Sequence, residues 1–194
     1  KNNTINKKSN IYKFRILYHL AGIYFLFGFT YVIYATFIVT YLVKEKGFSE
    51  FSAGNFWTIV GFLSLLSGPV FGGISDKSSR KKALMIVFSL QAFAYFLASF
   101  TFHEYCIYIS IFLFGIAAWS IPSIMIAATG DYFGSDKTPT AFGFITFVFA
   151  FGQIAGPYSA GLIAEKTNSF SMSFAISGVL GVTAVILAML LKDG

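Results

Sequence analysis

The chain has 194 residues, of which 56% are hydrophobic and 11% are charged, and its formal net charge is +6. Soluble domains carry about 25% charged residues, so this composition argues against a soluble protein. The basic balance does not indicate nucleic-acid binding, because the cations gather at the ends of apolar segments, as they do in membrane proteins. The single cysteine has no partner for an intrachain disulfide.

Residues 1–15 are polar and basic and contain too few apolar side chains to form a core. We expect them to be a cytoplasmic linker or tail, followed by a transmembrane bundle over residues 16–194. The chain does not begin with methionine and ends three residues after Leu191. We therefore expect it to be a piece of a longer protein.

Six segments without a charged side chain follow this tail, each of at least 21 residues. About 20 apolar residues in a helix cross the hydrocarbon core of a bilayer, whereas the strands of a membrane barrel would be about 10 residues long and alternate in polarity. The sequence therefore predicts an all-α membrane protein with six spans. We place the spans at about 16–43, 54–75, 83–103, 105–130, 139–164 and 170–191.

The cations are distributed unevenly between the two ends of these spans. Eleven of the 14 Lys and Arg side chains fall on the side of the N-terminus, and the other side has Lys44, Lys46 and Lys166. Because cytoplasmic segments are enriched in Lys and Arg, both termini are predicted to be cytoplasmic.

Proline residues are expected to bend three spans. Pro69, Pro122 and Pro157 lie inside the second, fourth and fifth spans, where each removes a helix hydrogen bond. The stretches 68–73 and 156–161 also resemble each other, since both begin with Gly-Pro and contain further small residues. Spans two and five cross the membrane in opposite directions, so the similarity favours two inverted repeats of three helices; the alternative is that membrane helices are simply rich in glycine.

The most informative stretch is the polar turn after span two, which reads Gly72-Gly73-Ile74-Ser75-Asp76-Lys77-Ser78-Ser79-Arg80-Lys81. Its glycines allow close approach of another helix. Asp76 is predicted at the membrane surface, where a carboxylate can bond a cation or the N-terminus of a helix. The alternative is that the cations only mark the cytoplasmic side.

This turn resembles the loop motif of the major facilitator superfamily (MFS) of transporters, with Ser79 in place of a glycine. The resemblance implies a conformational role, a latch at the cytoplasmic side, for Gly72, Gly73, Asp76, Lys77, Arg80 and Lys81. A second set in span five is similar to the glycine-proline motif of the superfamily's fifth helix and is expected to act in helix packing and bending: Gly143, Gly152, Gly156, Pro157 and Gly161.

The resemblance implies one MFS-type bundle of six helices with 3+3 inverted repeats, which would pair with a second six-helix bundle of the same transporter. Span four lacks a cation and span one is rich in tyrosine. Both features look like the C-terminal half, helices 7 to 12, of a bacterial subfamily, and the N-terminal half is the alternative.

By the same analogy, spans one, two, four and five line a central cavity, and spans three and six face lipid. Polar or aromatic side chains near the middle of the lining spans are candidate substrate contacts; we select Tyr31, Tyr34, Trp119, Ser120 and Gln153. Gln91, in span three, is instead expected to bond a neighbouring helix.

The predicted function is secondary transport of a small solute by alternating access, as a symporter or antiporter in the bacterial inner membrane, with this chain as one half. The predicted partners are the lipid bilayer, the other half, the solute and a coupling ion. We expect no enzyme activity, cofactor or metal site, because the spans contain no carboxylate pair or cluster of metal-binding side chains. A six-helix membrane scaffold or self-associating channel is the alternative.

Overall fold

The structure is a computed structural model that describes residues 11–100 and 103–191. Within these ranges the chain is helical and no strand occurs. The elements are η1 (Ile11–Lys13), α1 (Arg15–Lys44), α2 (Glu50–Lys77), α3 (Arg80–Ser99), α4 (Glu104–Ala117), α5 (Ser120–Phe133), α6 (Thr138–Thr167) and α7 (Ser171–Met189). Most of the predicted tail, residues 1–10, lies outside the described residues.

Six helical stretches are long and apolar enough to cross a membrane, with α4 and α5 together forming the fourth. The prediction of an all-α protein with six spans is confirmed. Two helices, α2 and α3, begin before the predicted spans at a serine that caps their first turn. Ser49 accepts a hydrogen bond from the N–H of Ser52 at the start of α2 (3.1 Å), which moves that start to Glu50.

The fourth span is interrupted between Ala117 and Ser120. The break places Pro122 in the first turn of α5, where its missing N–H would have no partner within the helix. The N–H of Trp119 donates to Ser67 Oγ of α2 at 3.2 Å. The bend predicted for this span is thus a break three residues before the proline, whereas α2 and α6 remain helical through Pro69 and Pro157.

The contacts between spans follow the pattern of an inverted repeat. The major packing of α1 against α6, span one on span five, has its counterpart in the packing of α2 against α4, span two on span four. The contact of α1 with α7 likewise corresponds to that of α3 with α4, and α3 packs on α7. Exchanging the first three spans with the last three therefore maps the first two contacts onto their counterparts and the α3–α7 contact onto itself.

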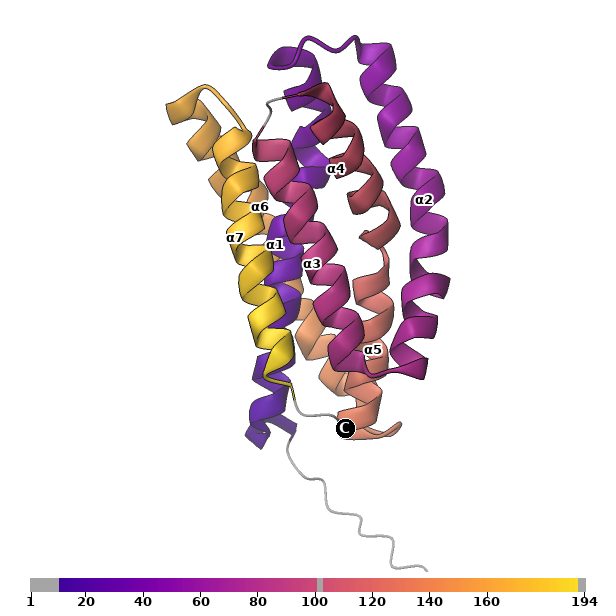
Figure 1. The fold of residues 1–194 in the computed structure, drawn as a ribbon. Helices are drawn as coiled ribbons and strands as arrows, with labels where there is room; N and C mark the ends of the chain where they lie inside the picture. Colours follow the sequence, from indigo (N-terminus) through magenta and orange to yellow (C-terminus); the bar gives the residue numbers. More distant parts are fainter. Residues whose placement is uncertain (1–10, 101–102, 192–194) are drawn as a thin grey trace, which may run out of the picture.

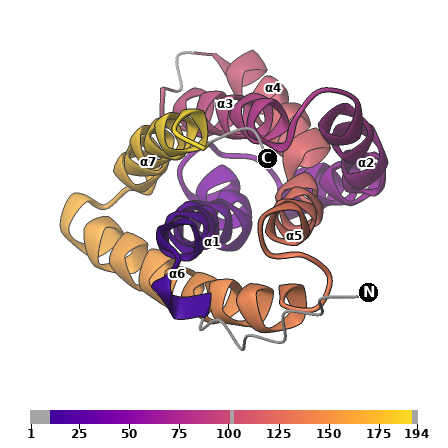
Figure 2. The same ribbon diagram turned by 90° about the horizontal axis from the view of Figure 1, so that it is seen from below.

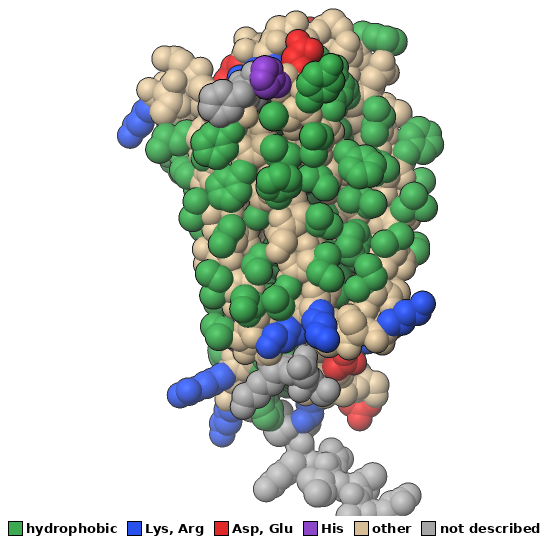
Figure 3. Space-filling model, viewed as in Figure 1, with side chains coloured by type: hydrophobic (Ala, Val, Ile, Leu, Met, Phe, Trp, Pro, Cys, Tyr) green, Lys and Arg blue, Asp and Glu red, His purple; other side chains and the backbone are tan. Residues whose placement is uncertain are grey.

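Viewed along the helices, α1 lies inside the bundle and α2 lies at its edge (Figure 2). The start of α1 and the end of α7 are at the same end of the molecule (Figure 1). A wide band of hydrophobic side chains covers the face in Figure 3, and Lys and Arg side chains gather at its lower border. This is the surface of an integral membrane protein, because a soluble monomer rarely exposes so large an apolar area.

Candidate functional site

Three helices meet at the guanidinium of Arg80, at the end of the bundle where the chain enters α1. Its Nε donates to Asp131 Oδ2 at 2.7 Å, and its Nη1 donates to Ser75 Oγ at 2.9 Å and to the carboxylate of Asp76. Ser75 and Asp76 end α2, Arg80 begins α3, and Asp131 lies in the last turn of α5. We call Ser75, Asp76, Arg80 and Asp131 the Arg80 cluster.

The local sequence explains this geometry. The backbone of Ser79 is extended (φ −169°, ψ 156°), a conformation that any residue adopts, and its hydroxyl accepts from the N–H of Lys82 at 3.3 Å to cap α3. The turn therefore does not require the glycine that the superfamily motif has at this position. A sharp two-residue turn then returns Arg80 to the end of α2, next to Asp76 four residues earlier.

The Arg80 cluster is open to its surroundings. The side chains of Arg80, Asp131 and Asp76 are 25%, 46% and 69% exposed. Ion pairs with this exposure add little to folding stability. Their effect is to fix the end of α5 against the turn between α2 and α3.

The remaining residues of the loop motif have no partner of this kind in the described part of the chain. Lys77 and Lys81 make no ion pair with a described residue. A Cβ built on Gly72 or Gly73 would meet nothing within 4 Å. The face of α2 that carries these glycines is therefore not packed against a helix of this bundle.

The glycines of α6 divide into two kinds. Gly152 and Gly156 lie directly on the backbone of α1, where a Cβ on Gly152 would come within 2.9 Å of Phe29 N and one on Gly156 within 3.1 Å of Phe29 Cα. A Cβ on Gly143 or Gly161 would meet nothing within 4 Å. Only the first pair is therefore required for the close crossing of α1 and α6.

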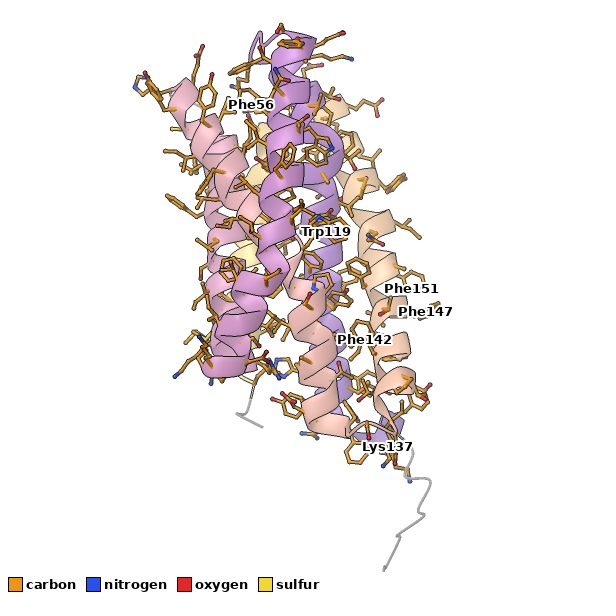
Figure 4. The ribbon with its side chains drawn as sticks, turned by 90° about the vertical axis from the view of Figure 1, so that its right-hand side faces the viewer. Phe56, Trp119, Lys137, Phe142, Phe147 and Phe151 are labelled. Carbon is orange, nitrogen blue, oxygen red and sulfur yellow. The ribbon has the colours of Figure 1, made fainter. Side chains whose placement is uncertain are left out.

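The five candidate cavity residues fall into two groups, one with partly exposed side chains and one with buried side chains. The ring of Tyr31 is half-buried, stacks on Phe114 with centroids 5.7 Å apart, and lies edge-on to Trp119 at 6.2 Å. Trp119 is 56% exposed and lies at mid-height between α2 and the part of α6 that carries Phe147 and Phe151 (Figure 4). Gln153 of α6 is half-buried.

Tyr34 and Ser120 lie inside the bundle core. Tyr34 is 0% exposed and its hydroxyl shares a 2.8 Å hydrogen bond with Ser110 of α4. Ser120 is 0% exposed and donates to the carbonyl of Ala117 at 2.8 Å. In this structure neither side chain is placed where a solute could reach it.

Several residues at these contacts were not among those selected from the sequence. Asp131 belongs to a short charged stretch predicted at the same end of the spans as Asp76. This shared location could have identified Asp131 as a candidate partner of the loop motif. Ser67, which bonds the broken span, had no distinguishing signal among the many serines. At the opposite end, Glu45 accepts from the hydroxyl of Ser169 (2.6 Å) and the N–H of Phe170 (2.9 Å), at the N-terminus of α7.

A model of the family described as "Uncharacterised MFS-type transporter YbfB" matches residues 3–190. The chain belongs to this family of MFS-type transporters. Monocarboxylate transporter 4 of Gallus gallus is 22% identical over 179 residues, which are 90% of this chain and 37% of that protein. The tetracycline resistance protein, class H, of Pasteurella multocida is 27% identical over 113 residues, which are 58% of this chain and 28% of that protein.

The fold of this MFS-type chain is also found in a solved transporter. The crystal structure of a peptide transporter POT in complex with sulfate aligns with a TM-score of 0.79 and 19% identity over 89% of this chain and 36% of that one. The chain thus spans a little over a third of the length of these proteins. The relatives are transporters and not enzymes. Among the described residues, no group of three or more His, Cys, Asp or Glu side chains could hold a metal ion.

Proposed function

We propose that this chain is one half, helices 7 to 12, of a secondary transporter that moves a small solute across the cytoplasmic membrane of a bacterium by alternating access. The other half would be a second six-helix bundle, and both ends of this half would be cytoplasmic. The observation that carries the proposal is the Arg80 cluster, which joins the ends of the second, third and fourth spans at the predicted cytoplasmic end.

The ion pairs of the Arg80 cluster are weak enough for a latch that must open and close during transport. Two partly exposed carboxylates hold Arg80, and exposed ion pairs of this kind contribute about 0–1 kcal/mol each. Exchange between two states a few kcal/mol apart can therefore make and break them. In this proposal the cluster holds α5 against α2 in one state, and the unpacked face with Gly72 and Gly73 meets the other half.

The proposed substrate contacts from this half are Tyr31, Trp119 and Gln153. They come from three spans, and Trp119 sits where the fourth span is broken, a feature that marks the binding sites of many transporters. No Asp, Glu, Lys or Arg occurs in residues 16–43, 105–130 or 138–164. A charged group that binds solute or a coupling ion would then come from the other half.

Uptake into proteoliposomes that contain the full-length protein tests this proposal. Lactate, a dipeptide and tetracycline are suitable first probes, because the similar proteins are named for monocarboxylates, peptides and tetracycline. We expect Asp76→Asn to slow uptake of a transported probe while membrane insertion stays normal. Unchanged uptake kinetics in that variant would argue against the latch, and a protein that moves none of a broad solute panel would favour the scaffold alternative.

A further inference from the structure

A buried amide on α3 carries a hydrogen-bond donor without an acceptor. Gln91 is 0% exposed, and its Nε2 has no hydrogen-bond partner among the residues that the structure describes. The expectation that Gln91 bonds a neighbouring helix is therefore wrong for this atom. Its Oε1 accepts from Tyr95 of the same helix at 3.5 Å, the limit for such a bond.

The hydroxyl groups of Thr30 and Tyr34 on α1 and of Ser110 on α4 already donate hydrogen bonds to other acceptors. Thr30 of α1 donates to the carbonyl of Leu26 at 2.9 Å. Ser110 donates to the carbonyl of Ala94 at 2.7 Å, so Tyr34 must be the donor in its 2.8 Å bond with Ser110. These oxygens keep free lone pairs, whereas Gln91 has free N–H groups.

Exchanging the positions of Oε1 and Nε2 in the Gln91 side chain still leaves one of these atoms without a hydrogen-bond partner. Nε2 would then face the Tyr95 oxygen and Oε1 would take the place of the unpartnered atom. That oxygen would need a donor, and the protons of Thr30, Tyr34 and Ser110 are already engaged. Both orientations of the amide need one more group that can donate and accept.

We propose that Gln91 binds a single buried water molecule that bridges its amide to the hydroxyl of Tyr95. Buried waters typically make two to four such bonds to polar groups that lack partners. In a membrane bundle the need is strong, because lipid offers no alternative partner. The presence of this water does not depend on transport.

Hydroxyl-radical footprinting of the full-length protein in detergent tests this site, since X-ray-generated radicals modify side chains next to ordered waters. Tyr95 is 0% exposed, and we expect it to be modified nonetheless. Gln91→Leu removes the amide and should lower that modification severalfold. Ser89→Ala, on the exposed side of the same helix, should leave it unchanged.

Tyr41 serves as the internal reference, because it is equally buried and its hydroxyl donates directly to the carbonyl of Ala98 at 2.8 Å. It should be modified little in all variants, and a rise at Tyr41 would show that a variant is misfolded. For that case, an experimental structure at a resolution that shows ordered waters gives an independent answer. Equal modification of Tyr95 with and without the amide, or no density beside Gln91 where other buried waters are visible, would overturn the proposal.

Discussion

Arg80 and Asp131 are 51 residues apart in the chain, yet Nε of Arg80 donates to Oδ2 of Asp131 at 2.7 Å. This bond joins the start of the third span to the end of the fourth. Together with the bond between Ser67 and Trp119, it ties both ends of α5 to neighbouring elements. The short helix α5 is thus attached to α2 near the membrane centre and to the turn between α2 and α3 at the membrane surface.

Neutralising Asp131 should release the lower end of α5. Asp131→Asn replaces a charge-assisted bond by a weaker one, and for a half-exposed pair we expect about 1 kcal/mol, or about a fivefold change in the rate or equilibrium of closure. Initial rates of solute uptake by the full-length protein measure this. Asp136→Asn, on the neighbouring exposed loop, is the matched control and should behave as wild type.

Removing the hydroxyl of Ser67 should loosen the break in the fourth span. Ser67→Ala leaves the N–H of Trp119 without its acceptor, and the loss of one hydrogen bond, about 1 kcal/mol, predicts about fivefold faster amide exchange. Hydrogen–deuterium exchange of peptides over residues 115–123 measures it. Ser64→Ala should have no effect there, because Ser64 donates to the carbonyl of Gly61 in its own helix at 2.7 Å.

Adding a methyl group at the crossing of α1 and α6 should destabilise the bundle. Gly156→Ala places a Cβ against the backbone of Phe29, and overpacking of this kind costs about 1–3 kcal/mol. Thermal unfolding in detergent should show a lower midpoint. Gly143→Ala, in the same helix but with open space around the new Cβ, should unfold at or above the wild-type temperature; equal losses for the two variants would contradict this assignment.

Glu45 should hold the end of α1 and the start of α7 together. Glu45→Gln keeps one acceptor oxygen but removes the charge that bonds Ser169 and Phe170, so we expect faster proteolysis in the loop over residues 168–171. Limited proteolysis of the full-length protein measures the rate of cleavage in this loop. Glu50→Gln, at the start of α2, is the control, and equal cleavage of the two variants would show that Glu45 is not required.

The spans could be predicted from the sequence because an uninterrupted apolar segment and a bilayer of fixed thickness leave little choice of structure. The pairing of Arg80 with Asp131 could not, because it depends on how two distant spans pack. The same limit applies to Tyr31 and Tyr34. Both were selected as candidate substrate contacts, and they are three residues apart in span one. Tyr31 lies beside the exposed Trp119, whereas Tyr34 is buried and bonded to Ser110.

The loop motif shows a further limit. Its residues were predicted as one unit, but the structure brings only Asp76 and Arg80 together, with Ser75 and Asp131. Gly72 and Gly73 face open space in the described structure. In the proposed transporter their partner would be the other half, so the contacts within this chain would not reveal their role.

A charge exchange between Arg80 and Asp131 tests whether the Arg80 cluster acts as a latch. In full-length protein, Arg80→Asp and Asp131→Arg should each slow uptake of a transported solute, because each places like charges together at the cluster. The double variant restores an opposite pair, next to Asp76, and should transport faster than either single variant. A latch at the Arg80 cluster is contradicted if both single variants transport at the wild-type rate. It is also contradicted if the double variant is no faster than the slower single variant.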